Sequence, residues 1–424
     1  MIFSNARILT FDRDHRVFDS GSVEVLPDGT FGRVESRRRS GAGVIDAGGR
    51  LLMPALINCH SHLYSTLARG MRLPGRPPAN FSEILRKLWW RLDRALTLDD
   101  VYWSALVALV DSAKCGVGTV IDHHSSPSAC AGSLDAIEAA FHEVGLRGAT
   151  CYETSDRNGR TAAEEAIREN VRFAEKNRTL VGAAFGLHAS FTLSDRTLRA
   201  CLEANCSLRL PFHVHVAEDQ CDAGAARRLC RAGVLDRRAL AAHCVHVSAA
   251  ELRMLARHGV NVIHNPQSNC NNAVGIARTT AMANAGITVA LGSDGFSPRM
   301  WDEFTTAYEL QKLRSRDPRI GPSESFALLF RNNPAIVEKL WGVKLGCIQS
   351  GAAADFILAD YFPPTPINQG NLSGHLLFGI ANAPVDTLVV NGRFVVREKR
   401  CVAVDERRLA AKATARARAL WERI

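Results

Sequence analysis

The sequence lacks the features that mark several large classes of protein. Its 424 residues contain no apolar run of about 18 residues, so we expect no membrane-spanning helix and no membrane partner. The opening stretch Met1–Arg7 has no long apolar segment, so a secretory signal peptide is not expected. The 12 cysteines are scattered and form no Cys-x-x-Cys pair, which favours reduced thiols and a cytoplasmic location.

Positive charge is in moderate excess, with a formal net charge of +9. The basic residues concentrate at Arg37–Arg39 and in the Ala/Arg-rich tail from Arg407 to Arg423. Neither an interleaved aromatic pattern nor a nucleic-acid motif accompanies them, so we expect no nucleic-acid partner. The composition, 46% hydrophobic and 22% charged, is typical of a globular protein with a large core.

Both ends of the chain contain strand-like segments. They are Ile2–Leu9, Val17–Leu26, Gly43–Ile45, Ala354–Asp360 and Val385–Val396. Asp28-Gly29 and Asn391-Gly392 are turn signals between or within them. Because residues 1–52 are few for a separate domain, we predict one small composite β-sandwich from residues 1–52 and 346–405. A C-terminal helix is expected over residues 406–424.

The middle of the chain, residues 53–345, repeats an alternation of strand and helix. Eight apolar, strand-like runs each close on polar residues: Pro54–His62, Gly118–Ile121, Gly148–Tyr152, Gly182–Leu187, Leu210–Val214, Ala239–Ala242, Val260–Ile263 and Ile287–Leu291. Helix-like segments between them include Asp99–Lys114, Ser133–Val144, Thr161–Lys176, Asp195–Ala204 and Ala249–His258. This alternation predicts an α/β fold, a (β/α)₈ TIM barrel. A doubly wound open sheet is the competing fold, but it does not explain polar clusters at all eight ends.

The first run ends in His60-Ser61-His62. Residues two apart on a strand share a face, so both imidazoles point the same way and could reach one metal ion. His215, just past the fifth run, is a candidate third ligand, although His213 shares its strand face. Asp294 follows a buried-looking strand, where an unpaired carboxylate would need a cation or a hydrogen-bonding partner.

Two further residues suggest acid–base chemistry beside that ion. Glu218 lies three residues after His215 and is a candidate proton shuttle. His243 ends the sixth run and could contact the attacked group, whereas His246 is more typical of a structural histidine. Imidazole and carboxylate ligands suit one divalent ion, zinc above all, with iron(II) and manganese as alternatives. Such an ion makes water nucleophilic near neutral pH.

These stretches resemble the amidohydrolase superfamily, in its aminohydrolase and chlorohydrolase branch. The resemblance rests on Pro54–His62, His215–Glu218, Ala242–Val245, His264–Asn269, Leu291–Gly295, Gly351–Asp355 and Gly374–Gly379. It implies the barrel with a composite β-sandwich. It also implies the metal ligands His60, His62, His215 and Asp294 and the catalytic residues Glu218, His243 and Asp294. Dimers are common among such relatives, so a homodimer is an expectation from the resemblance.

Subgroup features narrow the resemblance. Trp89–Asp93, Asp122–Pro127 and Ser155–Gly159 are similar to SsnA-type aminohydrolases and to deaminases of oxidised purines. The fourth run closes on Phe185–His188 without a lysine, where relatives with two metal ions carry a carboxylated lysine. This favours the single-metal deaminase type over hydantoinase-like hydrolysis.

Substrate contacts are predicted from position alone. His188 ends the fourth run and corresponds to a substrate-side histidine of related deaminases. Arg157 or Arg160 could meet a carbonyl or carboxylate of the ligand. His123 and His124 could line the pocket, and Trp89 or Trp90 could stack on a flat ring.

The sequence therefore predicts a metal-dependent hydrolase for a small-molecule substrate. It would deaminate an amino-substituted nitrogen heterocycle, such as a purine, by attack of metal-activated water and release ammonia. The alternatives are a cyclic amide hydrolase or an aromatic dechlorinase on the same site. A catalytically silent metal-binding component of a complex is the third possibility.

Overall fold

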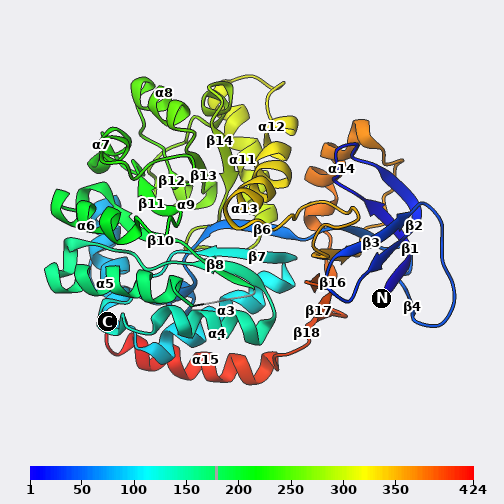
Figure 1. Cartoon of the computed structure of the whole chain (residues 1–424), viewed down its shortest axis with the longest axis horizontal. Helices are drawn as coiled ribbons and strands as arrows, with labels where there is room; N and C mark the ends of the chain where they lie inside the picture. The colour runs from blue at the N-terminus through cyan, green and yellow to red at the C-terminus, as the bar shows by residue number, and fades with distance from the viewer. Residues whose placement is uncertain (177–179) are drawn as a thin grey trace.

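The computed structural model describes residues 1–176 and 180–424. Figure 1 shows a β-rich region at the right, built from the blue and the orange-to-red ends of the chain. A larger region lies beside it, in which helices surround parallel strands. Within the described residues, every helix is too short or too polar to cross a lipid bilayer.

The β-rich region is one hydrogen-bonded sheet that joins the two ends of the chain. Its N-terminal strands are β1 (Ile2–Leu9), β2 (Val17–Val25), β3 (Phe31–Glu35), β4 (Val44–Asp46) and β5 (Leu51–Pro54). Its C-terminal strands are β15 (Phe356–Ala359), β16 (Val385–Val390), β17 (Arg393–Arg397) and β18 (Arg400–Cys401). The ends meet where β5 pairs antiparallel with β15, with Leu52 opposite Leu358. The predicted sandwich of two packed sheets stays a prediction.

The two turn signals of this region lie against each other. Gly29 and Gly392 have φ of +83° and +71°, which glycine adopts without steric cost. A Cβ on Gly29 would lie 2.8 Å from the carbonyl oxygen of Asn391. Both glycines are therefore required by backbone conformation, and Gly29 also by the close approach of the second turn.

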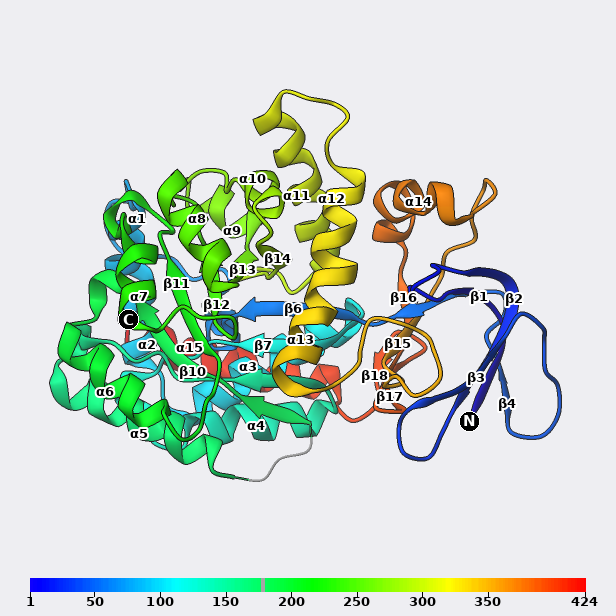
Figure 2. The same ribbon diagram turned by 45° about the horizontal axis from the view of Figure 1, so that its top comes forward.

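The larger region contains two parallel sheets. One consists of β6 (Leu56–Ser61), β7 (Val117–Asp122), β8 (Arg147–Thr150) and β9 (Val181–Ala183). The other consists of β10 (Phe185–Ala189), β11 (Phe212–Val216), β12 (Leu240–His243), β13 (Asn261–His264) and β14 (Thr288–Leu291). Isolated parallel bridges, Ser61 to Asp294 and Thr154 to Leu187, link the sheets. Figure 2 shows the resulting barrel-like arrangement, with β6, β7, β10, β11 and β12 at its centre.

This arrangement matches the predicted alternation with one local difference. The fourth strand-like run is broken at Ala184 into β9 and β10, and the two pieces belong to different sheets. An α/β fold of the barrel type is therefore observed, while closure into one continuous (β/α)₈ barrel stays a prediction.

Helices follow most of these strands at the predicted places. The outer helices are α3 (Leu98–Lys114), α4 (Ser133–Val144), α5 (Arg160–Ala174), α6 (Asp195–Asn205), α7 (Ala225–Ala232), α8 (Ala249–His258), α11 (Met300–Ser315) and α13 (Asn333–Trp341). Shorter ones are α1 (Phe81–Ile84), α2 (Trp90–Ala95), α9 (Pro266–Asn271), α10 (Thr279–Asn284), α12 (Pro322–Phe326) and α14 (Leu372–Phe378). Capping boxes begin α3 at Thr97 and α8 at Ser248, which explains the sharp starts of these helices.

The C-terminal helix α15 (Glu406–Trp421) packs along α3, under the barrel-like region in Figure 1. Its end is tied down by side chains. Trp421 Nε1 donates to the carbonyl of Leu67 at 2.8 Å, and Arg423 forms an ion pair with the buried Asp100. The helix therefore fixes the 3₁₀ helix Leu63–Ala68, which directly follows His62.

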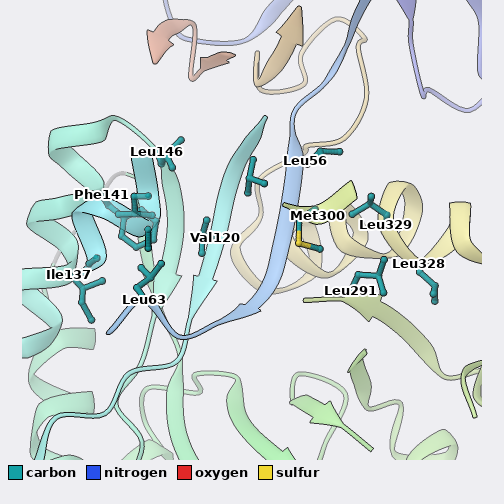
Figure 3. Close-up of a cluster of buried hydrophobic side chains, with 14 of the residues drawn as sticks. Leu56, Leu63, Val120, Ile137, Phe141, Leu146, Leu291, Met300, Leu328 and Leu329 are labelled. Carbon is teal, nitrogen blue, oxygen red and sulfur yellow. The ribbon is translucent and has the colours of Figure 1, made fainter. Parts of the chain in front are cut away.

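Apolar side chains between strands and outer helices form the main core. Figure 3 shows Phe141 and Ile137 of α4 turned toward Val120 of β7, with Leu291 of β14 near Met300 of α11. Parallel strands covered by helices are buried on their faces, which explains why these runs read as nearly continuous apolar sequence.

A buried ion pair joins this region to the terminal sheet. Arg147 of β8 donates from Nε to Asp355 Oδ2 at 3.0 Å, and the backbone N–H of Asn391 donates to Asp355 Oδ1 at 2.7 Å. The two charged side chains are 8% and 3% exposed. Removing one member of such a pair leaves the other charge buried without compensation.

We therefore expect Asp355→Ala to lower the free energy of unfolding by about 3–5 kcal/mol. The measurement is urea denaturation followed by circular dichroism. The matched control is Asp317→Ala, which removes one member of the exposed Arg319–Asp317 pair and should leave the midpoint unchanged. Equal effects of the two variants would contradict the expectation.

Candidate metal centre and active site

The carboxyl ends of β6, β11, β12 and β14 bring the predicted residues together. His60 comes from β6 and His62 directly follows that strand, while His215 comes from β11, His243 from β12, and Asp294 follows β14. All five are buried. The bridge between Ser61 and Asp294 holds the end of β14 against β6.

His60 and His62, at the end of β6, point to the same side, as their spacing predicts. His62 Nδ1 donates to the carbonyl of His123 at 2.6 Å, while its Nε2 lies 3.0 Å from Asp294 Oδ1. His60 Nε2 lies 3.7 Å from the same oxygen and has no hydrogen-bond partner. Both rings therefore turn Nε2 toward one carboxylate oxygen.

His215 completes the group from the opposite sheet. Its Nδ1 donates to the carbonyl of His188 at 2.7 Å, and its Nε2 lies 3.2 Å from His62 Nε2. His213, the alternative ligand, instead places Nε2 2.8 Å from His60 Nδ1, on the far side of the His60 ring. The geometry thus favours His215 as a ligand and His213 as a support for His60.

Asp294 is held in place by its own backbone and by a neighbour. Its φ of +57° is a left-handed conformation that non-glycine residues rarely adopt, and the N–H of Gly295 donates to its Oδ1 at 2.9 Å. Ser268 Oγ contacts the other carboxylate oxygen. Burial acts to raise the pKa of Asp294, but the neighbouring imidazoles of His60 and His62 hold that pKa well below its ordinary value.

The protonation of the imidazoles suits metal binding. Burial lowers the pKa of His60 to about 3 and the pKa of His215 well below its ordinary value, so both rings are neutral. For His62 burial acts in the same direction, but Asp294 outweighs it and raises the pKa to about 9. His62 therefore carries an extra proton at neutral pH, and a cation bound between these atoms would replace it.

Several combinations of these side chains could hold an ion. His60, His215, His243 and Asp294 place one ligand atom each within 4.8 Å of one another. A second set, His62, His123, Glu153 and His215, meets the same criterion. His215 belongs to both sets, and His62 Nε2 lies against His215 Nε2. The two sets therefore describe one crowded centre.

Glu218 and His243 flank this centre. Glu218 Oε2 lies 3.5 Å from His243 Nε2, and Asn272 Nδ2 donates to Glu218 Oε1 at 3.3 Å. Burial raises the pKa of Glu218 to about 7, against the opposing charge of His243. His243 Nδ1 is bonded to Asn269 Oδ1 at 2.9 Å, and its φ is +70°. A carboxyl group that titrates near neutral pH is suited to general acid–base catalysis.

A cavity of about 40 Å³ opens in front of the centre. We call it the catalytic cavity. Its wall includes predicted residues of both kinds: His62, His215, Glu218, Asp294, His188, Arg157 and Trp89. His60 and His243 lie behind this wall, fully buried. The sequence did not decide whether Trp89 or Trp90 would stack on the ligand, and Trp90 lines the cavity as well.

The remaining candidates lie elsewhere. His123 is fully buried behind the cavity wall, with Nε2 3.0 Å from the carbonyl of His213, which favours a supporting role over direct substrate contact. His124 bonds Ser126 Oγ at 2.7 Å. Arg160 is on the exposed face of α5 and pairs with Glu164. His246 bonds the carbonyl of Val274 at 2.6 Å, as expected of a structural histidine.

Arg157 lies in the cavity wall, but its guanidinium already forms ion pairs within the protein. Its Nη1 lies 3.2 Å from Glu153 Oε2, its Nη2 donates to Ser125 Oγ at 2.8 Å, and the guanidinium also pairs with Asp93. Two carboxylates therefore surround one guanidinium. The predicted pairing of Arg157 with a ligand carboxylate would have to compete with both.

Sequence reasoning missed Glu153, Asp93, Ser268 and Asn272. Glu153 ends the third strand-like run, so its position at a polar strand end was the available signal. Asp93 lies on α2, far in sequence from Arg157, and no local pattern connects the two. Their partners are decided by tertiary packing alone.

Known proteins resemble this chain over most of its length. The model of the amidohydrolase family matches residues 51–395. A 5-methylthioadenosine/S-adenosylhomocysteine deaminase of Desulforudis audaxviator is 31% identical over 430 residues, which cover 96% of this chain and 94% of that enzyme. A 5'-deoxyadenosine deaminase of Methanosarcina mazei is 30% identical, covering 100% of this chain and 99% of that enzyme.

Among solved structures, an adenosine deaminase from Xanthomonas campestris with bound zinc superimposes with a TM-score of 0.86. The match covers 100% of this chain and 98% of that one at 20% sequence identity. At this level of identity the likeness concerns the fold, an α/β amidohydrolase fold.

We expect the purified protein to bind about one divalent ion per chain, held by imidazole and carboxylate groups. His215→Ala should remove most of it, because His215 Nε2 faces both His62 and the Asp294 carboxylate. His213→Ala, which only removes support for His60, should weaken affinity about 10- to 100-fold. The measurement is metal content by plasma mass spectrometry and competition with a chelator.

The matched control is His246→Ala, whose ring nitrogens bond Val274 and Gln220. This variant should keep its metal. Full metal occupancy in His215→Ala would place the ion elsewhere.

Proposed function

The chain belongs to the amidohydrolase family, and we propose that it is a metal-dependent deaminase of an amino-substituted nitrogen heterocycle. The carrying observation is the buried Glu218, with a pKa near 7, facing the same cavity as the Asp294 carboxylate and the imidazoles of His62 and His215. Relatives at 30–31% identity are named as deaminases of adenosine derivatives. We therefore propose an aminopurine ring as the substrate class.

The residues present fit a divalent ion. His60 Nε2 is a buried polar atom with no hydrogen-bond partner, and imidazoles with one carboxylate are typical zinc ligands. We propose His60, His62, His215 and Asp294 as the ligands and zinc as the ion. When bound, it would supply the Lewis acidity that makes water a nucleophile near neutral pH.

The side chains then divide the proton transfers. In the overall reaction water adds at the ring carbon that bears the amino group, and ammonia leaves with a carbonyl formed in its place. Glu218, protonated near neutral pH, donates its proton to the neighbouring ring nitrogen. Asp294, kept ionised by its histidines, accepts one proton of the attacking water and passes it to the leaving amine. The remaining hydroxyl proton returns to Glu218 as the carbonyl forms and ammonia leaves.

The supporting residues orient these groups. Asn272 holds the Glu218 carboxyl, and Asn269 fixes the His243 ring so that Nε2 points between Glu218 and Asp294. From that position the protonated His243 ring could donate from Nε2 to oxygen at the attacked carbon. His188 and the two tryptophans of the wall would contact the ring itself.

The finer organisation is also part of the proposal. We propose a closed barrel over residues 53–345, a composite sandwich from 1–52 and 346–405, and a C-terminal helical segment at 406–424. The linking bridges between the two parallel sheets support closure. A homodimer rests on the family resemblance, and a cytoplasmic location rests on cysteines that are all free in the structure.

We expect Glu218→Gln to lower kcat by on the order of 10²- to 10⁴-fold, because glutamine cannot transfer the proton. The measurement is ammonia release from a panel of aminopurines, pterins and aminotriazines, with metal content determined for each preparation. Glu251→Gln is the matched control, since this buried glutamate caps α8 rather than facing the cavity. Wild-type turnover by metal-loaded Glu218→Gln would overturn the assignment of the proton donor.

A further inference from the structure

Asp222 is a buried carboxylate in the wall of the catalytic cavity that the proposed reaction does not use. It lies in the loop after β11, four residues beyond Glu218, and is 5% exposed. Its two oxygens accept hydrogen bonds from backbone N–H groups of two different loops. One carboxylate therefore joins segments that carry separate parts of the cavity wall.

One oxygen of Asp222 holds the residue that precedes the proposed proton donor. The backbone N–H of Ala217 donates to Asp222 Oδ2 at 2.9 Å. Ala217 has a φ of +46°, a left-handed conformation that residues with a side chain rarely adopt. Glu218 follows this turn directly, so the direction of its carboxyl group depends on how Ala217 is held.

The other oxygen of Asp222 holds the mouth of the cavity. The backbone N–H of Phe191 donates to Asp222 Oδ1 at 3.1 Å. Phe191 lies in the 3₁₀ helix Ser190–Thr192 after β10, lines the catalytic cavity and is 42% exposed. An aromatic ring that lies open at the mouth is available to contact a flat ligand.

The two loops leave neighbouring strands. β10 and β11 pair in parallel, with Ala189 opposite His215, as Figure 2 shows for the two strands. Arg228 of α7 also reaches the loop after β10, where its Nη1 donates to the carbonyl of Ser190 at 2.6 Å. Arg228 thus holds that loop from one side, whereas Asp222 connects it to the turn before Glu218.

These contacts favour a positioning role over direct substrate contact. Both oxygens of Asp222 already accept from buried backbone groups, which need a partner in the folded protein. Burial raises the pKa of Asp222 to about 7, and the N–H groups of Ala217 and Phe191 act against that rise. The carboxylate that the two N–H groups favour is thus the main form above neutral pH.

We propose that Asp222 is a positioning residue that fixes the proton donor Glu218 and the mouth residue Phe191 relative to each other. The inference rests on the proposed deaminase function, because Glu218 is assigned as the proton donor in that reaction. Asp222 acts through the two backbone groups that it binds, and takes no proton from the substrate.

The kinetic test uses Asp222→Asn in metal-loaded enzyme at pH 8, with the best substrate of the panel. Asparagine keeps one acceptor oxygen but places an NH₂ group against the other backbone N–H. We expect kcat to fall by on the order of 10- to 100-fold, since small misplacements of reacting groups have effects of this size.

A double-mutant cycle distinguishes positioning from a general structural defect. In the Glu218→Gln background the loss caused by Asp222→Asn should nearly vanish, because residues that act through one group have non-additive effects. A structural defect lowers kcat equally in both backgrounds. That result, or an unchanged kcat in Asp222→Asn alone, contradicts the proposal.

Asp156→Asn is the matched control. Asp156 also ties the segment after β10 to another loop, since its carboxylate accepts from the N–H of Ser194 at 2.6 Å and from Thr197 Oγ1 at 2.7 Å. None of these three residues lines the catalytic cavity. The control should keep wild-type kcat, and a loss as large as in Asp222→Asn would mean that loosening any loop is sufficient.

Amide exchange tests the link without any turnover. In Asp222→Ala, peptides that contain Phe191 and Ala217 should both take up deuterium faster than in wild type, as measured by mass spectrometry. Asp222→Asn is the milder variant for the same measurement. Faster exchange at both sites in a protein whose wild type deaminates no panel compound keeps the link and contradicts the deaminase proposal. Unchanged exchange at Ala217 overturns this inference, whichever compounds the wild type deaminates.

Discussion

The approach of a buried carboxylate to imidazole nitrogens from several strands is the interaction on which the rest of this structure depends. Asp294 Oδ1 lies 3.0 Å from His62 Nε2 and 3.7 Å from His60 Nε2. Burying a carboxylate is costly unless other charges or hydrogen bonds compensate it. Parallel strands provide that compensation because their carboxyl ends meet at one edge, where distant parts of the chain can converge.

The same strand ends also decide which nitrogen of each ring is available. His62 and His215 both donate from Nδ1 to a carbonyl of a neighbouring strand end, at His123 and His188. This fixes the tautomer and leaves Nε2 free to face Asp294. Left-handed backbone at Ala217, His243 and Asp294 marks the positions where the chain leaves the sheet to make this possible.

Much of the fold and part of the site could be predicted because they follow from local rules. The spacing of His60 and His62 places them on one strand face, and turn residues such as Asn391-Gly392 mark hairpins wherever they occur. Helix α4 begins and ends at the expected residues because Gly145 terminates its apolar pattern. The break at Ala184 was not predicted, since an apolar run carries no signal for the sheet that each half joins.

Arg157 shows why the remaining site could not be predicted. An arginine after a strand end predicts a cation for an anionic ligand when only the sequence is considered. In the folded protein, Glu153 and Asp93 surround that guanidinium, and its side chain is 8% exposed. The deciding residue, Asp93, lies 64 positions away, so its effect is a property of tertiary packing. Breaking a buried ion pair of this kind leaves charges buried without compensation. A contact between Arg157 and an anion from solvent would not make up for that loss.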